Sequence, residues 1–252
     1  MKSTTKLSVN LNKVATLRNT RTNGIPDVAH AAHVALEAGA DGITLHPRPD
    51  ERHIRPTDVY QIASLMEEYP EAELNIEGNP FHGLMRFAED VRPAQCTLVP
   101  DEPNAFTSNQ GWKLSQNRKA LGEVIAQLKE WGCRVSLFMD ADSDEWELVR
   151  EIGGDRVELY TEPYAEAFAK NENLENVLNQ FAKAAEQSRR AGLEVNAGHD
   201  LSLDNLGTFL QTVGDVAEVS IGHALIADAL EYGLAGTVHM YLAVIGAVSE
   251  SM

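Results

Sequence analysis

Two short polar clusters near the start of the chain carry five Lys or Arg side chains between them. They are Asn10-Leu-Asn-Lys-Val-Ala-Thr-Leu-Arg-Asn-Thr-Arg21 and His46-Pro-Arg-Pro-Asp-Glu-Arg-His53. Residues 1–55 contain eight Lys or Arg against five Asp or Glu, whereas the whole chain has a net charge of −17. Guanidinium and ammonium groups bind phosphate oxygens strongly. An acidic protein with two such loops is therefore expected to bind small phosphorylated metabolites.

Four residues within and after these clusters could grip phosphate or move protons. His46 can exchange a proton near neutral pH, and Arg48 can hold a phosphate with a fork of donors. His53 is either a second ligand contact or a surface residue ahead of the next helix. Glu77 follows an apolar run, where partial desolvation would raise its pKa toward the range of a general base. The alternative for Glu77 is a structural carboxylate that caps the next helix.

Two Gly-His pairs late in the chain are further candidates. They occur in Asn196-Ala-Gly-His-Asp200 and in Ile221-Gly-His-Ala224, each after an apolar run. Glycine lets the backbone approach a ligand closely, and amides at a helix N-terminus favour phosphate. His199 is then either a phosphate ligand or a second acid/base group, and Gly222 with His223 forms the matching loop.

A repeated local pattern indicates the elements that position these residues. A helical stretch, a glycine and a short apolar run recur, with the glycines at Gly39, Gly132, Gly153, Gly192 and Gly214. Glycine is typical where a helix ends in a left-handed residue, and mostly apolar runs are typical of covered parallel strands. Each recurrence is therefore the second half of a βα unit.

This pattern and three further runs predict eight strands and the helices between them. The strands are expected at residues 7–11, 42–46, 73–77, 95–99, 134–139, 155–160, 194–197 and 216–221. The clearest helices are expected at Asp27–Ala38, Thr57–Glu68, Arg118–Trp131, Asp144–Ile152 and Asn173–Ala191. Eight units in 252 residues predict an α/β fold, a single-domain (β/α)8 TIM barrel over residues 1–252. A doubly wound sheet is the rival, but no glycine-rich dinucleotide loop follows the first strand.

A (β/α)8 barrel carries its active site at the C-terminal ends of the strands, so polar residues there are expected to converge. They are Asn10, Asn12, His46, Glu77, Asp140, Glu158, Asn196, His199, Gly222 and His223. We expect Asp140 and Glu158 to support the site rather than to react. The polar segment from Val99 to Gln116 is long enough for a functional lid, with Thr107 offering a hydroxyl and Trp112 an apolar anchor.

Composition argues against several other functions. The net charge of −17 disfavours nucleic acid and anionic membranes as partners. No apolar signal core opens the chain and residues 240–248 are too few to cross a bilayer, so a cytoplasmic location is expected. Cys96 and Cys133 lack zinc-ligand spacing and are expected to be buried thiols. His30 and His33 share a helical face without a further ligand motif, so no metal site is expected there.

Assembled in order, these segments resemble the pyridoxine 5′-phosphate synthase family of vitamin B6 biosynthesis. The matching motifs are Val9-Asn-Leu-Asn12, Ala15-Thr-Leu-Arg-Asn19 with Arg21, Ala38-Gly-Ala-Asp-Gly-Ile-Thr-Leu-His46, Arg52-His-Ile54, Cys96-Thr-Leu-Val-Pro100, Val135-Ser-Leu-Phe138, Val195-Asn-Ala-Gly-His199 and Ile221-Gly-His-Ala-Leu-Ile226. The resemblance implies a cofactor-free condensation of 1-deoxy-D-xylulose 5-phosphate with 3-amino-2-oxopropyl phosphate. Water and one phosphate leave, and aldol-type closure gives the pyridine ring. It also implies a homo-octamer.

The resemblance further implies a role for each candidate residue. His46, Glu77 and His199 would be the acid/base residues, with Glu77 the main proton shuttle at the reacting carbons. Residues implied to bind the deoxyxylulose phosphate are Asn10, Asn12, Lys13, Arg48, His53 and Thr107. Residues implied to bind the aminoketone phosphate and the product are Arg21, Asp200, Gly222 and His223. The chain departs from the family pattern at Asn12-Lys13, where Asp-His is expected, and at Glu162 and Asp200, where glycines are expected.

Two other functions stay open from the sequence. One is a different phosphate-binding barrel, such as a sugar-phosphate isomerase or an aldolase. An aldolase needs a Schiff-base lysine at a strand end, and Lys13 is the only lysine near one. The other is a non-catalytic protein that binds a B6 phosphate. The joint presence of His46, Glu77 and His199 favours catalysis over binding alone.

Overall fold

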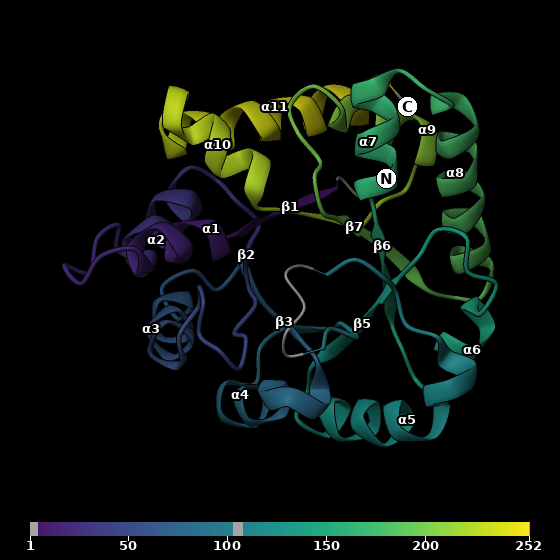
Figure 1. The fold of residues 1–252 in the computed structure, drawn as a ribbon, viewed down its shortest axis with the longest axis horizontal. Coiled ribbons are helices and arrows are strands. Elements are labelled where there is room, and N and C mark those ends of the chain that lie inside the picture. Colours follow the sequence, from purple (N-terminus) through teal and green to yellow (C-terminus); the bar gives the residue numbers. More distant parts are fainter. Residues whose placement is uncertain (1–4, 103–107, 252) are drawn as a thin grey trace.

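Eight parallel strands close into a barrel with helices around it, in a computed structural model that describes residues 5–102 and 108–251 (Figure 1). The strands are β1 (Lys6–Asn10), β2 (Gly42–Leu45), β3 (Glu73–Gly78), β4 (Gln95–Leu98), β5 (Arg134–Met139), β6 (Arg156–Tyr160), β7 (Glu194–Gly198) and β8 (Glu218–Ile221). Each strand pairs with the next, and β8 pairs with β1. The predicted TIM barrel is confirmed, and the eight strands lie within two residues of their predicted bounds.

The helices connect successive strands and cover the outside of the barrel. They are α1 (Asn12–Asn19), α2 (Val28–Glu37), α3 (Pro56–Met66), the π-helical turn η1 (Pro80–Leu84), α4 (Met85–Val91), α5 (Leu114–Glu130), α6 (Trp146–Glu151), α7 (Glu162–Lys170), α8 (Leu174–Arg190), α9 (Leu206–Val213), α10 (His223–Tyr232) and α11 (Leu234–Ser251). The five glycines predicted to end helices all have positive φ, for example 95° at Gly39. Within the described ranges, no helix is long and apolar enough to cross a membrane.

Two local predictions need correction. The first polar cluster was expected to be a loop, but α1 begins two residues after β1, and the Asn10 side-chain oxygen accepts from the backbone N–H of Asn12 at 3.0 Å. Helix α5 begins four residues before its predicted start. The carboxylate of Glu145 accepts from the N–H groups of Leu114 and Ser115 at 2.6 and 2.8 Å, so a distant residue caps this helix.

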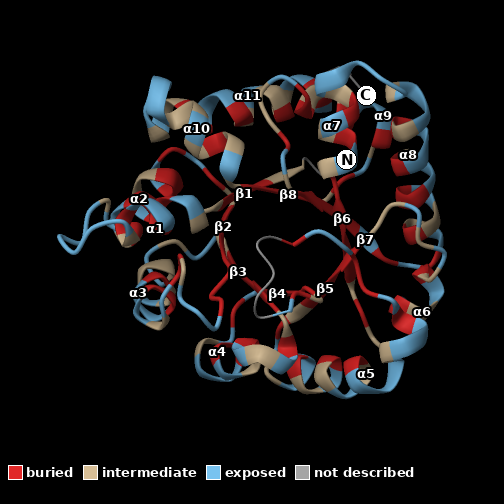
Figure 2. Ribbon diagram, viewed as in Figure 1, coloured by how far each residue is buried: buried red, intermediate tan, exposed pale blue. Residues whose placement is uncertain are grey.

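The strands alternate between an apolar outer face and a polar inner face. Leu7 and Val9 of β1 are fully buried in the core shared with the helices, whereas the hydroxyl of Ser8 bonds that of Thr44 on β2 at 2.6 Å. Figure 2 shows the ring of buried strands enclosed by helices whose outer sides are exposed. The expectation of mostly apolar strands therefore holds for the outer face, while the barrel interior is polar.

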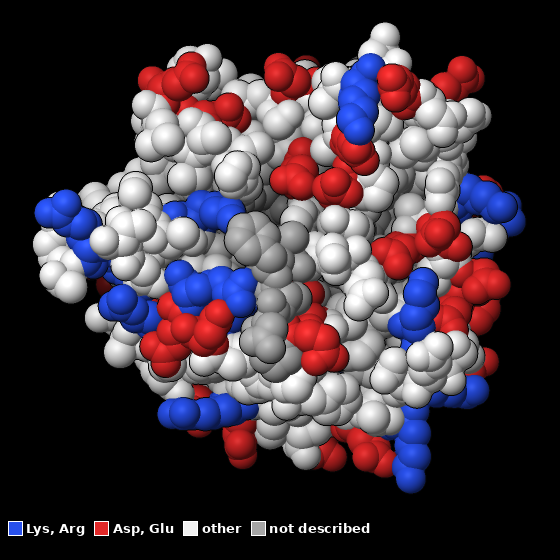
Figure 3. All heavy atoms as spheres, in the orientation of Figure 1, with Lys and Arg blue, Asp and Glu red and all other residues white. Residues whose placement is uncertain are grey.

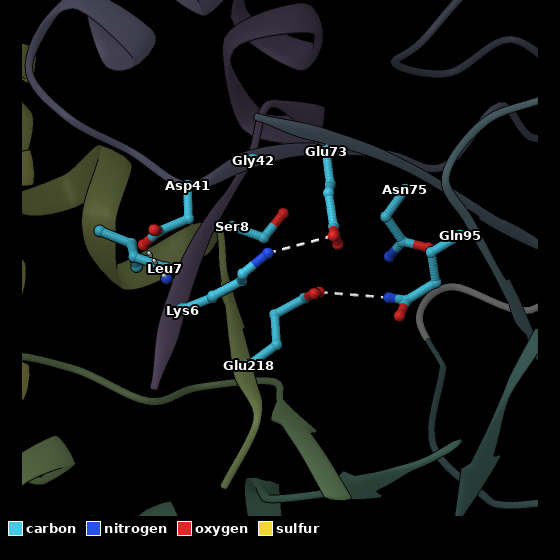
Figure 4. A pocket seen from close by; sticks show the side chains of 9 residues that line it. All are labelled: Lys6, Leu7, Ser8, Asp41, Gly42, Glu73, Asn75, Gln95 and Glu218. Atoms are coloured by element: carbon cyan, nitrogen blue, oxygen red, sulfur yellow. Dashed lines mark hydrogen bonds and ion pairs between the residues drawn. The ribbon is translucent and has the colours of Figure 1, made fainter. Parts of the chain in front are cut away.

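The barrel floor, at the N-terminal ends of the strands, is a network of paired charges. It consists of Lys6, Glu73, Gln95, Arg134, Arg156 and Glu218. Lys6 donates to Glu73 at 3.0 Å, and Arg134 pairs with the same carboxylate. Gln95 donates to Glu218 at 3.2 Å (Figure 4), and Arg156 lies 3.3 Å from Glu218. Each carboxylate of the floor thus has a cation beside it.

The two cysteines lie on the outer side of neighbouring strands. Cys96 is in β4 and Cys133 precedes β5; both are buried and neither forms a disulfide. The prediction of buried thiols is confirmed.

Candidate active site

His46 and Glu77 meet at the barrel mouth, which is formed by the C-terminal ends of the strands. His46 follows β2 and Glu77 lies in β3, and the imidazole Nδ1 is 3.8 Å from the carboxylate Oε2. The side chain of Asn12 accepts from the backbone N–H of His46 at 3.0 Å, and Asn10 donates to Glu77 at 3.5 Å. Residues at the junction of β1 and α1 therefore hold both groups, which are 6% and 8% exposed.

Burial gives these two groups complementary protonation states. Desolvation, with the negative charges of Asp101 and Glu218, raises the pKa of Glu77 to about 8. Desolvation, with the positive charge of Arg48, lowers the pKa of His46 well below its ordinary value. Near neutral pH a protonated carboxyl therefore faces a neutral imidazole, and the carboxyl can exchange its proton with a bound substrate.

The second polar cluster lies beside this pair. Arg48 is buried and its guanidinium pairs with the carboxylate of Asp101. The ring of His53 lies edge-on to that of His46 with centroids 6.1 Å apart, and burial with the charge of Arg48 lowers the pKa of His53 to about 4. His53 is therefore buried at the mouth rather than on the surface. Sequence reasoning missed Asp101, although it comes soon after the end of the fourth strand.

Residues of the first polar cluster have two roles: Arg18 stabilises the fold, and Lys13 adds charge near the mouth. Arg18 is buried, pairs with Asp58 of α3 and donates to the backbone oxygen of His53 at 3.1 Å. It holds the second cluster in place instead of facing a ligand. Lys13 is exposed on α1. Its charge adds to the larger effects of burial and Arg48 on the pKa of His53.

His199 stands across the mouth on a strained backbone. Its φ is 86° and that of Asp200 is 58°, a region that residues other than glycine rarely adopt. The hydroxyl of Thr161 donates to the backbone oxygen of Gly198 at 2.7 Å and bonds that of His199 as well. The imidazole packs edge-on against Tyr160 with centroids 5.2 Å apart. Thr161 and Tyr160 therefore hold this histidine in its position.

Asp200 and the start of α10 complete this side. The Asp200 carboxylate lies 3.3 Å from Nδ1 of His199, and this hydrogen bond lowers the pKa of Asp200. Gly222 precedes α10, and a Cβ on it would lie 3.1 Å from the Cβ of Asn10, so the two strand ends approach as only glycine allows. His223 is the first residue of α10 rather than part of a loop, and it is exposed.

Two predicted residues, Arg21 and Asn196, are not brought into this cluster. Arg21 is exposed in the segment between α1 and α2, which extends away from the barrel in Figure 1. Thr107 lies outside the described residues. Asn196 was expected at the mouth but donates to Gln95 of the floor at 3.4 Å. Its register opposite Glu218 places it below the mouth, because β7 continues to Gly198.

The residues expected to support the site lie below it and beside it. Glu158 is buried in β6 with one carboxylate oxygen lacking a hydrogen-bond partner among the described residues, and burial with the charge of Glu77 raises its pKa. Asp140 accepts from the N–H of Gly111 at 2.9 Å. Trp112 is buried, and its indole donates to the backbone oxygen of Leu98 at 2.9 Å. Trp112 thus anchors the segment that follows β4, as expected.

Lys and Arg are unevenly distributed on the surface, as they are along the sequence. Figure 3 shows Lys and Arg grouped around α1 and α3 on the displayed face, near the two polar clusters. Among the described residues, no group of three or more His, Cys, Asp or Glu is arranged to hold a metal ion. The site offers buried acid/base groups together with cationic side chains that can donate hydrogen bonds to an anion.

A (β/α)8 barrel with buried His, Glu and Arg side chains at its mouth has the architecture of a TIM-barrel enzyme. The chain belongs to the family described as pyridoxal phosphate biosynthesis protein PdxJ, whose model matches residues 7–247.

Similar proteins agree with this assignment. The pyridoxine 5′-phosphate synthase of Albidiferax ferrireducens is 55% identical over 244 residues, which cover 95% of this chain and 96% of that protein. The protein of the same name from Porphyromonas gingivalis is 48% identical over 237 residues, or 94% and 97% of the two chains. Among solved structures, KGPDC from Streptococcus mutans superimposes with a TM-score of 0.64 at 14% identity, covering 98% of this chain and 99% of that one. This last likeness concerns the fold alone.

Proposed function

We propose that the barrel mouth condenses 1-deoxy-D-xylulose 5-phosphate with 3-amino-2-oxopropyl phosphate to give pyridoxine 5′-phosphate. The family and its relatives give the function as a ring-closing pyridoxine 5′-phosphate synthase. The observation that carries the proposed chemistry is the buried pair of His46 and Glu77, 3.8 Å apart. A reaction with repeated proton transfers needs groups whose pKa values lie near the working pH. The carboxyl of Glu77, with a pKa of about 8, is such a group.

The proposed steps use three residues. The substrate amine adds to the ketone carbon, a C–N bond forms, and the ketone oxygen leaves as water after protonation by His46 or His199. Glu77 moves a proton at the reacting carbons, and one phosphate departs. Aldol-type attack then forms the C–C bond that closes the ring, and loss of water makes it aromatic. No step requires an oxidant or a reductant.

Two sides of the mouth suit two phosphorylated substrates. Asn10, Asn12, Lys13, Arg48 and His53 lie on the α1 and β2 side, where the cations are, and we assign them with Thr107 to the deoxyxylulose phosphate. Gly222 and His223 lie at the start of α10, and Asp200 follows β7, where the charge of His223 acts on it. We assign these three residues with Arg21 to the aminoketone phosphate and the product. Amide groups at the N-terminus of this ten-residue helix favour a phosphate. The Asp200 carboxylate would bind the substrate amine rather than the phosphate.

The protein is further proposed to be a cytoplasmic homo-octamer. Large apolar side chains are exposed on α1, α10 and α11, and α10 contacts both of the other helices. They include Leu17, Leu230, Tyr232 and Met240, of which Leu230 is 79% exposed. Such a group of apolar residues favours contact between subunits. Light scattering on purified protein would test the subunit number.

The test of function is direct synthesis. Purified protein with chelator is mixed with both substrates, and pyridoxine 5′-phosphate is followed by absorbance and mass. Product formation without added metal is expected, and the Glu77→Gln variant is expected to lose it. Full turnover by this variant would overturn the proposed role of Glu77, whereas no product from the wild-type protein would favour a binding protein. Trapping of Lys13 by borohydride with a pentose phosphate would instead indicate an aldolase.

A further inference from the structure

Asp101 lies beside two residues of the second polar cluster, His46 and Arg48. We propose that Asp101 is a positioning residue of the active site, whose carboxylate holds the Nε2 edge of His46 and the guanidinium of Arg48 and so fixes which imidazole nitrogen faces Glu77. This inference rests on the roles proposed above for His46 and Glu77.

The Asp101 carboxylate is itself held from several sides. It is 7% exposed, pairs with Arg48 and accepts from the hydroxyl of Ser108 at 2.7 Å. Its backbone oxygen accepts from the side chain of Asn79 at 3.0 Å. Donors from three separate segments thus converge on one buried residue, which is more than the neutralisation of Arg48 alone requires.

His46 lies between two carboxyl groups. Its Nδ1 is 3.8 Å from Glu77, and its Nε2 is 3.9 Å from Oδ2 of Asp101. Both distances exceed that of a hydrogen bond, and a cavity of about 10 Å³ borders His46, Arg48, Asn79 and Asp101. This space matches a single water molecule, which would bridge Nε2 to the Asp101 carboxylate.

This arrangement selects one tautomer. Burial keeps the imidazole neutral, so a single nitrogen carries the proton. The carboxylate of Asp101 accepts hydrogen bonds from Arg48 and Ser108, so the N–H of His46 is favoured at Nε2, on the Asp101 side. Nδ1 is then the acceptor and faces the carboxyl of Glu77, which keeps its proton near neutral pH. A carboxylate that orients a catalytic imidazole in this way is a recurring device in enzymes.

The same charge acts on Glu77. The titratable and charged groups that act on Glu77 are the acidic residues Asp101, Glu218 and Glu158 and the basic residue Arg48. Burial raises the pKa of Glu158, and His46 is neutral. Replacing Asp101 by Asn removes a negative charge and leaves the positive charge of Arg48 less compensated. Both changes lower the pKa of Glu77, so they reinforce each other.

The experiment compares Asp101→Asn with a matched control, Asp140→Asn. Asp140 also accepts from the segment after β4, at Gly111, but is not among the groups that shift Glu77. For Asp101→Asn we expect kcat to fall roughly 10–100-fold. The acid limb of the kcat/KM profile is expected to move about 0.5–1 unit to lower pH. The KM for the deoxyxylulose phosphate should not rise, because Arg48 loses a competing anion. The control should leave the acid limb in place.

An unmoved limb with unchanged kcat in Asp101→Asn, or an equal shift in Asp140→Asn, would overturn the inference. Should Asp101→Asn fail to fold, ¹⁵N NMR of histidine-labelled wild-type protein decides, with His46 assigned from a His46→Asn variant. The expected tautomer carries the proton on Nε2, and a proton on Nδ1 would contradict the proposal. The proposed function fails separately, if the wild-type protein forms no pyridoxine 5′-phosphate from the two substrates.

Discussion

Glu73 and Glu77 lie four residues apart on the same strand, β3, yet the two ends of the barrel treat them in opposite ways. At the floor, burial opposes ionisation of Glu73, but hydrogen bonds from Arg134 and Lys6 outweigh it and lower its pKa to about 2. At the mouth, burial and the charge of Asp101 raise the pKa of Glu77 to about 8. The residue type and strand are the same, so the difference comes from deeper burial and acidic neighbours at Glu77 and from two hydrogen-bonded cations at Glu73.

The difference separates stability from reactivity. At the floor, hydrogen bonds from Arg134 and Lys6 keep Glu73 ionised, so it stabilises the barrel, whereas burial raises the pKa of Glu218 although Arg156 lies beside it. At the mouth Arg48 is paired with Asp101 rather than with Glu77, and Glu77 therefore keeps a proton that it can exchange. Active sites commonly contain a group in an unfavourable environment, such as this buried carboxyl, at a cost in stability.

The largest expected effect is a difference in turnover between variants of the two glutamates. Glu77→Gln keeps the shape of the side chain but cannot exchange a proton, so turnover should fall roughly 10²–10⁴-fold. Glu73→Gln should change kcat less than about threefold, because the floor takes no part in the chemistry. Steady-state kinetics on folded protein measures both variants. Equal losses in the two variants would remove the distinction between floor and mouth.

Stability should show the reverse order. Glu73→Gln weakens a partly buried cluster with two cations and should cost about 2 kcal/mol of unfolding free energy near neutral pH. Because the folded pKa of Glu73 lies below its ordinary value of 4.5, this contribution is present above pH 4.5 and is lost as the pH falls toward 2. Urea unfolding of wild type and variant across this range measures it. A difference that grows on acidification would contradict the pairing.

A smaller effect is expected at Thr161, which holds the strained backbone of His199. Thr161→Val removes the hydroxyl that bonds the oxygens of Gly198 and His199, and kcat should fall about tenfold with little change in KM. Thr161→Ser restores the hydroxyl and should recover most of the rate. Failure of serine to rescue would assign the loss to packing instead.

The smallest effect compares two lysines. Lys13→Ala should raise the KM for a phosphorylated substrate by roughly two- to fivefold, and less at high salt, because this exposed cation at the mouth is screened. Lys6→Ala at the floor should leave KM unchanged. Initial rates at two ionic strengths measure both, and a salt-independent rise for Lys13→Ala would point to a structural cause.

Most of the fold could be predicted from the sequence, because its signals are local. Each glycine and apolar run lies within about ten residues, and eight such units leave few alternatives to a barrel. The convergence of His46, Glu77 and His199 followed from that geometry. The polar inner face of the strands could also be predicted from the sequence. Leu7-Ser-Val-Asn10, for example, alternates with a period of two, as a strand with two different faces does.

What the sequence could not supply was the choice of partners. Arg18 and Arg21 have the same chemistry, but Arg18 pairs with Asp58, 40 residues away, and Arg21 extends from the barrel. Asp101 contacts Arg48 across 53 residues, in a segment without periodicity. The rule that polar residues follow strand ends, applied to the fourth strand, would have found Asp101. Contacts of this length depend on the finished fold.

The most direct test of the contrast between floor and mouth is the pH dependence of unfolding for wild type and Glu77→Gln. The folded pKa of Glu77 lies above its ordinary value of 4.5, so its contribution is fully present below pH 4.5 and is lost as the pH rises through about 8. Glu77→Gln should therefore become steadily more stable than wild type between pH 5 and 8 and stay so above it. A stability difference that is constant across this range, or that favours wild type at high pH, would contradict the account.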